Sequence, residues 1–132
     1  MKDFNLQKGL TGSARITVTE AHTAMAFGSG RVRVYGTPAM VGLMEKAAIE
    51  AVDHKLPQGY VSVGTKIDVK HSAPTPVGMH VTANAELLDT DGPKLKFRVE
   101  AYDGNEKIGE GLHDRFIIRL EDLNKRAETK LK

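Results

Sequence analysis

The segment from Thr37 to Val52 constrains the fold of this 132-residue chain most strongly. Thr37 is followed by Pro38, which is typical of a helix N-cap with proline at the first helical position, and Leu56-Pro57-Gln58-Gly59 stops the apolar run that follows. Apolar side chains cover most of the surface of this helix, and one narrow sector holds Lys46, Glu50, Asp53 and His54. A helix of this kind lies at the centre of a domain, so the sequence predicts a sheet that wraps around it.

The rest of the chain predicts the strands of that sheet. Residues 12–20 alternate and are rich in β-branched side chains, which indicates a first strand. Apolar side chains then recur at every second position from Tyr60 to Val69, an alternation that places Val61, Val63 and His71 on the inward face. Three further strands with inward apolar rows are predicted at 79–87, 95–101 and 108–120.

Tight turns join the last four strands, which makes them consecutive and antiparallel. Gly109 and Gly111 in the last strand indicate a bulge or a close backbone approach. Residues 21–35 predict a short helical turn and a glycine-containing loop, a candidate mobile cover, and residues 121–128 predict a short solvated helix. We therefore expect one α+β domain over residues 1–132, with about five antiparallel strands around the helix and a dimer that protects the sheet edge.

Composition excludes several classes of function. The 19 basic and 17 acidic side chains are spread along the chain, which is too balanced for a nucleic-acid surface. The chain has no cysteine, which fits a reducing compartment, and no apolar run near 18 residues. Residues 1–8 lack the apolar core of a signal peptide. We expect a soluble, cytoplasmic protein with no nucleic-acid or membrane partner.

Metal and nucleotide motifs are also missing from the sequence. His22, His54 and His80 are not spaced with carboxylates into a ligand set, so no metal is expected. The patterns GxxxxGK[ST], GxGxxG and GxSxG do not occur, which removes the P-loop, dinucleotide and serine-hydrolase signatures.

Glu45 is the principal candidate for chemistry. On a helix its neighbours three and four positions away are Val41, Gly42, Ala48 and Ile49, all apolar or glycine. A carboxylate on such a face costs several kcal/mol unless it is paired or protonated, and perturbed carboxylates cluster at functional sites. The alternative is a structural ion pair with a lysine or arginine of the sheet.

His71 strengthens the functional interpretation of Glu45. An inward carboxylate and an inward imidazole are the groups needed for general-base or nucleophilic hydrolysis, although a lone inward histidine is more often structural. Thr37 is most simply the helix N-cap, and its hydroxyl lies about two turns from Glu45, where it can line the same pocket. Glu45 and His71 are therefore the candidates for catalysis, and Thr37 is a candidate for the lining of their pocket.

Two further residues are candidates for substrate binding. Gly64 is either a gap in the outward row of its strand or a position where a ligand approaches the backbone and an N–H stabilises an oxyanion. His113 and Arg115 alternate with apolar and acidic residues, and most such charges are solvated. Arg115 is the better candidate of the two, because a guanidinium can orient a carboxylate or bind phosphate.

Taken in order, these motifs resemble the hot-dog-fold thioesterases, and within them the fluoroacetyl-coenzyme A thioesterase group. The resemblance rests on Gly36-Thr37 with Met40-Val41-Gly42-Leu43-Met44-Glu45, on Val63-Gly64-Thr65, on Val69 to Gly78, and on Tyr102-Asp103-Gly104 with Ile108 to Arg115. It covers nearly the whole chain.

This resemblance implies a long helix wrapped by an antiparallel sheet, a homodimer that can pair further into a tetramer, and active sites at or near the subunit interface. It implies hydrolysis of an acyl-coenzyme A thioester without a cofactor. By position, Thr37, Glu45 and His71 match the catalytic threonine, glutamate and histidine of the group. Gly64 matches the backbone donor to the thioester oxygen, and Arg115 matches an arginine near the site.

In this picture Glu45 attacks the acyl carbon or activates water, His71 transfers the proton and Thr37 orients Glu45. The fluoroacetyl-specific enzyme has a phenylalanine-rich lid, whereas the corresponding stretch here looks shorter and reads Gly28-Ser29-Gly30-Arg31-Val32-Arg33. The sequence therefore predicts a different small acyl group. A non-catalytic acyl-thioester binder and a hydratase or dehydratase on the same fold remain alternatives.

Overall fold

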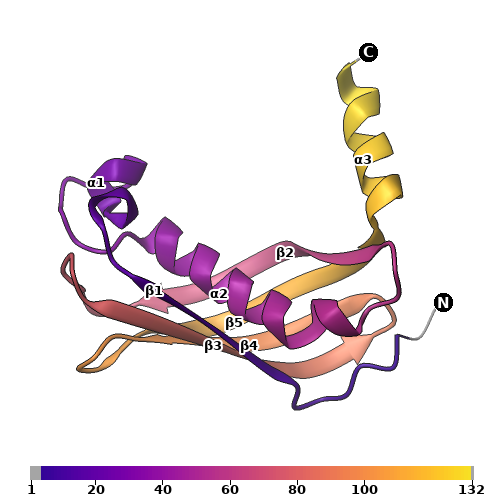
Figure 1. Cartoon of the computed structure of the whole chain (residues 1–132), viewed down its shortest axis with the longest axis horizontal. Helices are drawn as coiled ribbons and strands as arrows, with labels where there is room; N and C mark the ends of the chain where they lie inside the picture. Colours follow the sequence, from indigo (N-terminus) through magenta and orange to yellow (C-terminus); the bar gives the residue numbers. More distant parts are fainter. Residues whose placement is uncertain (1–3, 132) are drawn as a thin grey trace.

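The computed structural model describes residues 4–131, and its centre is helix α2 (Thr37–Val52) lying against one face of a curled antiparallel sheet (Figure 1). The sheet has five strands in the order β1-β3-β4-β5-β2. This architecture confirms the predicted hot-dog arrangement of a central helix and five antiparallel strands. The strands are β1 (Thr11–Thr17), β2 (Tyr60–His71), β3 (His80–Asp91), β4 (Lys94–Tyr102) and β5 (Lys107–Arg119).

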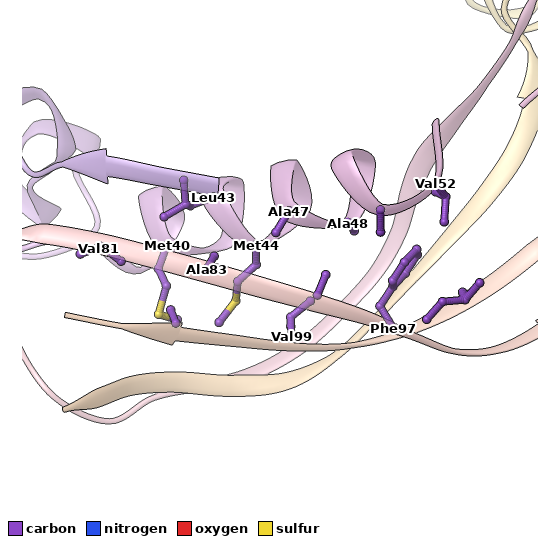
Figure 2. Packing of buried hydrophobic residues seen from close by; sticks show 14 of the residues in the cluster. Met40, Leu43, Met44, Ala47, Ala48, Val52, Val81, Ala83, Phe97 and Val99 are labelled. Carbon is purple, nitrogen blue, oxygen red and sulfur yellow. The ribbon is translucent and has the colours of Figure 1, made fainter. Parts of the chain in front are cut away.

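The core forms where α2 presses its apolar face onto the concave side of the sheet (Figure 2). Met40 and Met44 are fully buried, as are Phe97 and Val99 on β4. The inward rows predicted for β3 and β4 are confirmed. Gly109 makes a close approach of the kind predicted, because a Cβ there would lie 2.5 Å from Sδ of Met40. A side chain at that position would have to displace the buried thioether of Met40, and its Cβ would also lie 2.9 Å from the Lys70 carbonyl oxygen.

The segment between β1 and α2 folds as a 3₁₀ turn (Glu20–His22), a short helix α1 (Ala24–Phe27) and a loop, as predicted. β1 ends at Thr17 rather than at residue 20, because the 3₁₀ turn already begins at Glu20. A terminal helix α3 (Leu120–Glu128) and a 3₁₀ turn (Thr129–Leu131) follow β5. Among residues 4–131, no helix is long and apolar enough to cross a bilayer.

Strand β2 departs from the predicted alternation at a bulge. Its register with β5 shifts between Gly64 and Lys66, so one extra residue changes which side chains face inward. Before the shift, Ser62 is buried, and Val63 lies opposite Phe116 on the outer side. After it, His71 keeps its predicted inward face. The prediction that Val61 and Val63 point inward was wrong, and Gly64 is not part of the outward row.

Candidate active site

Helix α2 packs mainly on β1 and β3, so it covers one half of the concave face more than the other. The inner sides of β2 and β5 lie in the less covered half. The apolar face of α2 does not fill the space in front of these two strands, so their inward polar side chains have room beside the helix. Two pockets open there, one around Glu45 and one around His71.

The first pocket has a volume of about 270 Å³ and is lined by Glu45, Gly64 and His113, with Thr65, Lys66 and Ile67. The Glu45 side chain is 39% exposed, less buried than its apolar neighbours predicted, because Gly42 and Ile49 on either side of it are themselves exposed. Gly64 faces the carboxylate so closely that a Cβ would lie 2.4 Å from Oε2. The missing side chain is therefore what makes room for the carboxylate.

Arg115 holds this carboxylate from a nearly buried position. Its side chain is 4% exposed, and its Nη1 lies 3.4 Å from Oε2 of Glu45. Nε donates to Oγ of Ser62 and Nη2 donates to the Ser62 carbonyl, both at 2.8 Å. Ser62 in turn donates to Asp53, from Oγ at 2.6 Å and from its N–H at 3.2 Å. The guanidinium is fixed in one orientation, and burial lowers the pKa of Arg115.

His113 completes the surroundings of Arg115. Its side chain is buried, and Nη1 of Arg115 lies 3.1 Å from Nε2. Because a guanidinium can only donate, Nε2 accepts, and Nδ1 carries the hydrogen that it donates to the Lys66 carbonyl at 2.8 Å. Burial lowers the pKa of His113, which agrees with a neutral ring. The expectation that His113 is solvated was therefore wrong.

Thr37 and His71 meet in the second pocket, which has a volume of about 380 Å³ and is also lined by Tyr35. Oγ1 of Thr37 lies 2.7 Å from Nδ1 of His71. Gly36 takes the N-cap position and Thr37 is the first helical residue, so its hydroxyl is not used as the predicted cap. Burial lowers the pKa of His71 and so favours the neutral ring.

Two buried polar atoms in this second region have no hydrogen-bond partner among the described residues: the Tyr35 hydroxyl and Nε2 of His71. The two rings lie edge to face, with their centroids 6.4 Å apart. Burial raises the pKa of Tyr35, so its phenol is neutral.

The structure thus brings the predicted residues together as two groups. Thr37 contacts His71, and Glu45 lies with Gly64 and Arg115. Glu45 lies eight positions after Thr37 on α2, about 12 Å along the axis, and no hydrogen bond or ion pair within residues 4–131 joins the two groups. The orientation of Glu45 by Thr37 is therefore not seen within one chain.

Sequence reasoning missed Asp53 and Ser62, which shape the Glu45 group, and it ranked His113 below Arg115. A signal for His113 was present, since it shares the face of Arg115 at a spacing of two on a strand. Ser62 carried no signal, because the bulge that turns it inward is not visible in the alternation. Among the described residues, no group of three or more histidines and carboxylates could hold a metal ion.

Comparison with known proteins gives concordant results. A family model described as fluoroacetyl-CoA-specific thioesterase matches residues 18–121. A fluoroacetyl-CoA thioesterase from Streptantibioticus cattleyicolor is 45% identical over 97 residues, 74% of this chain and 70% of that protein. The solved structure of a fluoroacetyl-CoA thioesterase superposes with a TM-score of 0.89 at 36% identity, covering 96% of this chain and 98% of the other.

A hot-dog-like protein from Thermanaerovibrio acidaminovorans superposes equally well, with a TM-score of 0.89 at 28% identity, covering 99% of this chain and 98% of the other. The fold, the concave polar groups and the sequence match therefore agree. The chain belongs to the fluoroacetyl-CoA-specific thioesterase family of hot-dog proteins.

Proposed function

We propose that this chain hydrolyses the thioester of a small acyl-CoA, giving the free acid and CoA, with Glu45 as the group that acts on the acyl carbon. The observation that carries this proposal is the Glu45 carboxylate, half-exposed in a pocket, held by buried Arg115 and faced by Gly64. Thioester hydrolysis needs one nucleophile or base and one proton carrier near the acyl carbon. The thioesterase family to which the chain belongs performs this class of reaction.

In the proposed reaction, Glu45 either removes a proton from the water that attacks the acyl carbon, or attacks that carbon itself to form a mixed anhydride, which water then hydrolyses to release the acid and restore the carboxylate. In either route the carbon–sulfur bond breaks and CoA leaves as a thiolate. The thiolate takes up a proton that comes from the attacking water and passes through the imidazole of His71, which ends neutral as it began. The backbone N–H of Gly64 donates to the thioester oxygen, which carries negative charge in the transition state. No cofactor or metal takes part in this sequence.

The roles of Arg115 and Thr37 follow from their contacts. Arg115 orients the Glu45 carboxylate, because its own guanidinium is fixed by Ser62 and its Nη1 lies 3.4 Å from Oε2. The resemblance assigned Thr37 to Glu45, but its hydroxyl lies on Nδ1 of His71. We therefore assign Thr37 to the orientation of the imidazole.

The two groups can serve one reaction if they come from two copies of the chain. Within one chain, Thr37 and Glu45 lie about 12 Å apart along the axis of α2, and no hydrogen bond or ion pair within residues 4–131 joins their two groups. In a two-fold dimer whose interface brings the Thr37–His71 group of one protomer beside the Glu45 group of the other, the symmetry forms this combined site twice. We propose a homodimer of this kind.

The free edge of the sheet supports this dimer. β2 is an edge strand of 12 residues and pairs only with β5 within residues 4–131. An edge of this length is a ready template for pairing with another strand. Ile49 on α2 and Ile67 on β2 are both 37% exposed, which leaves apolar surface open on the helix and on this edge strand.

The acyl group is proposed to be small and other than fluoroacetyl, since the cover over the His71 pocket is built from Ser29, Gly30 and Val32 rather than from phenylalanine. Cytoplasmic location is proposed on the absence of cysteine. The proposed unit of function is one hot-dog domain over residues 1–132.

The test is thiol release from short, branched and aromatic acyl-CoA esters by the wild-type chain and by Glu45→Gln. Glu45→Gln is nearly isosteric, so its melting temperature serves as the control for folding. We expect release from at least one small ester and a loss of most of it in Glu45→Gln. Full release by the variant would refute the role of Glu45, and binding without release by the wild type would favour the non-catalytic binder. Addition of water to an unsaturated acyl chain would favour the hydratase.

A further inference from the structure

Helix α3 and the turn after it carry an apolar stripe that the described chain leaves uncovered. Its members are spaced by three and then four residues, which places them on one side of a helix. The first and last are 45% and 88% exposed, and none of the residues of α3 is buried. The apolar stripe consists of Leu120, Leu123, Ala127 and Leu131.

α3 stands clear of the rest of the protein. It packs mainly against the end of β5, from which it emerges, and against the turn that follows it. Figure 1 shows it rising away from α2 and from the sheet. A free helix of 9 residues is marginal in water, because most helical stability in proteins comes from packing of an apolar face. The apolar stripe therefore needs a partner.

The position of α3 points to that partner. The last residue of β5, Arg119, pairs with Tyr60 at the start of β2, and the N–H of Leu120 donates to the Gly59 carbonyl at 2.9 Å. The base of the helix thus sits at a corner of the edge strand. In Figure 1 the helix continues past β2, on the side away from β5. A strand that paired with the free edge of β2 would therefore lie on the same side of β2 as this helix.

The charges of α3 argue against a membrane or a nucleic acid as the partner. Three acidic residues are balanced by three basic ones between positions 120 and 131. Helices that bind anionic lipid surfaces carry an excess of lysine and arginine on the polar face. The charged residues are Glu121, Asp122, Glu128, Lys125, Arg126 and Lys130.

We propose that the apolar stripe docks on a second copy of this chain that pairs along β2, so that α3 clamps the partner across the sheet edge. This inference rests on the homodimer of the proposed function. In a two-fold dimer each α3 would contact the other protomer, so every substitution in the stripe acts twice. Helix α3 would then be exchanged between the two protomers, and it would stabilise the interface near which the Glu45 group and the Thr37–His71 group meet.

The test is the dimer dissociation constant of the full chain, measured by sedimentation equilibrium. Leu123→Asp places a charge in the middle of the apolar stripe and is expected to raise the dissociation constant at least about tenfold. The reason is that a buried leucine contributes more to association than the free energy that corresponds to a tenfold change in affinity. Ala127→Asp is the second variant, and because Ala127 is exposed in the single chain it leaves folding intact. Lys125→Gln changes the net charge equally on the opposite side and is expected to leave the constant unchanged.

The outcomes separate this inference from the proposed dimer. A wild-type chain that stays monomeric at all concentrations would overturn both. A wild-type dimer with unchanged dissociation constants in Leu123→Asp and Ala127→Asp would overturn the clamp alone and leave the interface at β2. Binding of the wild type to anionic phospholipid vesicles, lost in Leu123→Asp without a change in the dimer, would assign the apolar stripe to a membrane instead.

Discussion

Replacement of Gly64 by alanine tests the geometry around Glu45 most sharply. The new Cβ would lie 2.4 Å from Oε2 of Glu45, whereas ordinary contact begins at 3.4 Å, so the carboxylate must retreat by about 1 Å. It would also lie 3.2 Å from Cε1 of His113, a buried ring that cannot move freely. A misplacement of about 1 Å in a reacting group costs on the order of 100-fold in rate. We therefore expect kcat to fall by roughly that factor.

Stability is expected to respond little to the same change. The atom that must move is the end of a flexible, 39% exposed side chain, and alanine suits a strand better than glycine does by about 0.5–1 kcal/mol. The assay is thiol release from the best small acyl-CoA ester, with the melting temperature measured in parallel. Gly104→Ala is the matched control, because its Cβ would meet nothing nearer than Cε of Met79 at 3.6 Å. A folded Gly64→Ala variant that keeps most of the wild-type kcat would refute the placement of the reacting carboxylate at Gly64.

Three further predictions follow from the polar contacts. Ser62→Ala leaves Nε of Arg115 and one oxygen of Asp53 without their partner, so it should lower the free energy of unfolding by about 1–3 kcal/mol and reduce kcat; urea titration and thiol release check this. Tyr35→Phe removes a buried hydroxyl that has no partner among the described residues, so the melting temperature should rise; a fall would contradict that picture. Because burial lowers the pKa of His71 below 6.5, stability should decline as pH falls below about 6.5, where the unfolded chain takes up a proton that the folded one does not; urea titrations from pH 7.5 to 5 measure this.

The fold was predictable because its main elements carry strong local patterns. The apolar surface of 37–52 placed the helix within the sheet, and the period of two in β3 and β4 gave their buried rows. The free edge strand was also predictable from a single sheet around one helix. These features depend on periodicity over many residues, which tertiary contacts seldom override.

The site was predictable only in part. Glu45 and His71 stood out because each lies on an otherwise apolar row, and both do line pockets. The bulge after Gly64 was hidden, because a one-residue register shift depends on pairing with β5 and leaves no mark in the alternation of β2. It turns Ser62 inward and so fixes Arg115, which the sequence offered only as a candidate.

The partner of the Thr37 hydroxyl was likewise not predictable from local sequence. Threonine before proline at a helix start predicts a cap, yet the hydroxyl lies on Nδ1 of His71, 34 residues further along the chain. Local propensity gives no information on a contact of that range. The separation of Thr37 from Glu45 follows from the rise of a helix. Whether the two residues belong to one site depends on a second copy of the chain, which the sequence of one copy does not describe.

The central claim is that each active site joins His71 of one protomer with Glu45 of the other, and mixing two inactive variants tests it most directly. His71→Ala and Glu45→Gln chains with different tags would be combined, and the heterodimer would be purified and assayed for thiol release. If each site joins His71 of one protomer with Glu45 of the other, the heterodimer has one intact site and one doubly altered site, so it should recover about half of the wild-type kcat. A heterodimer no more active than either parent homodimer would contradict the shared site and place all catalytic groups in one chain.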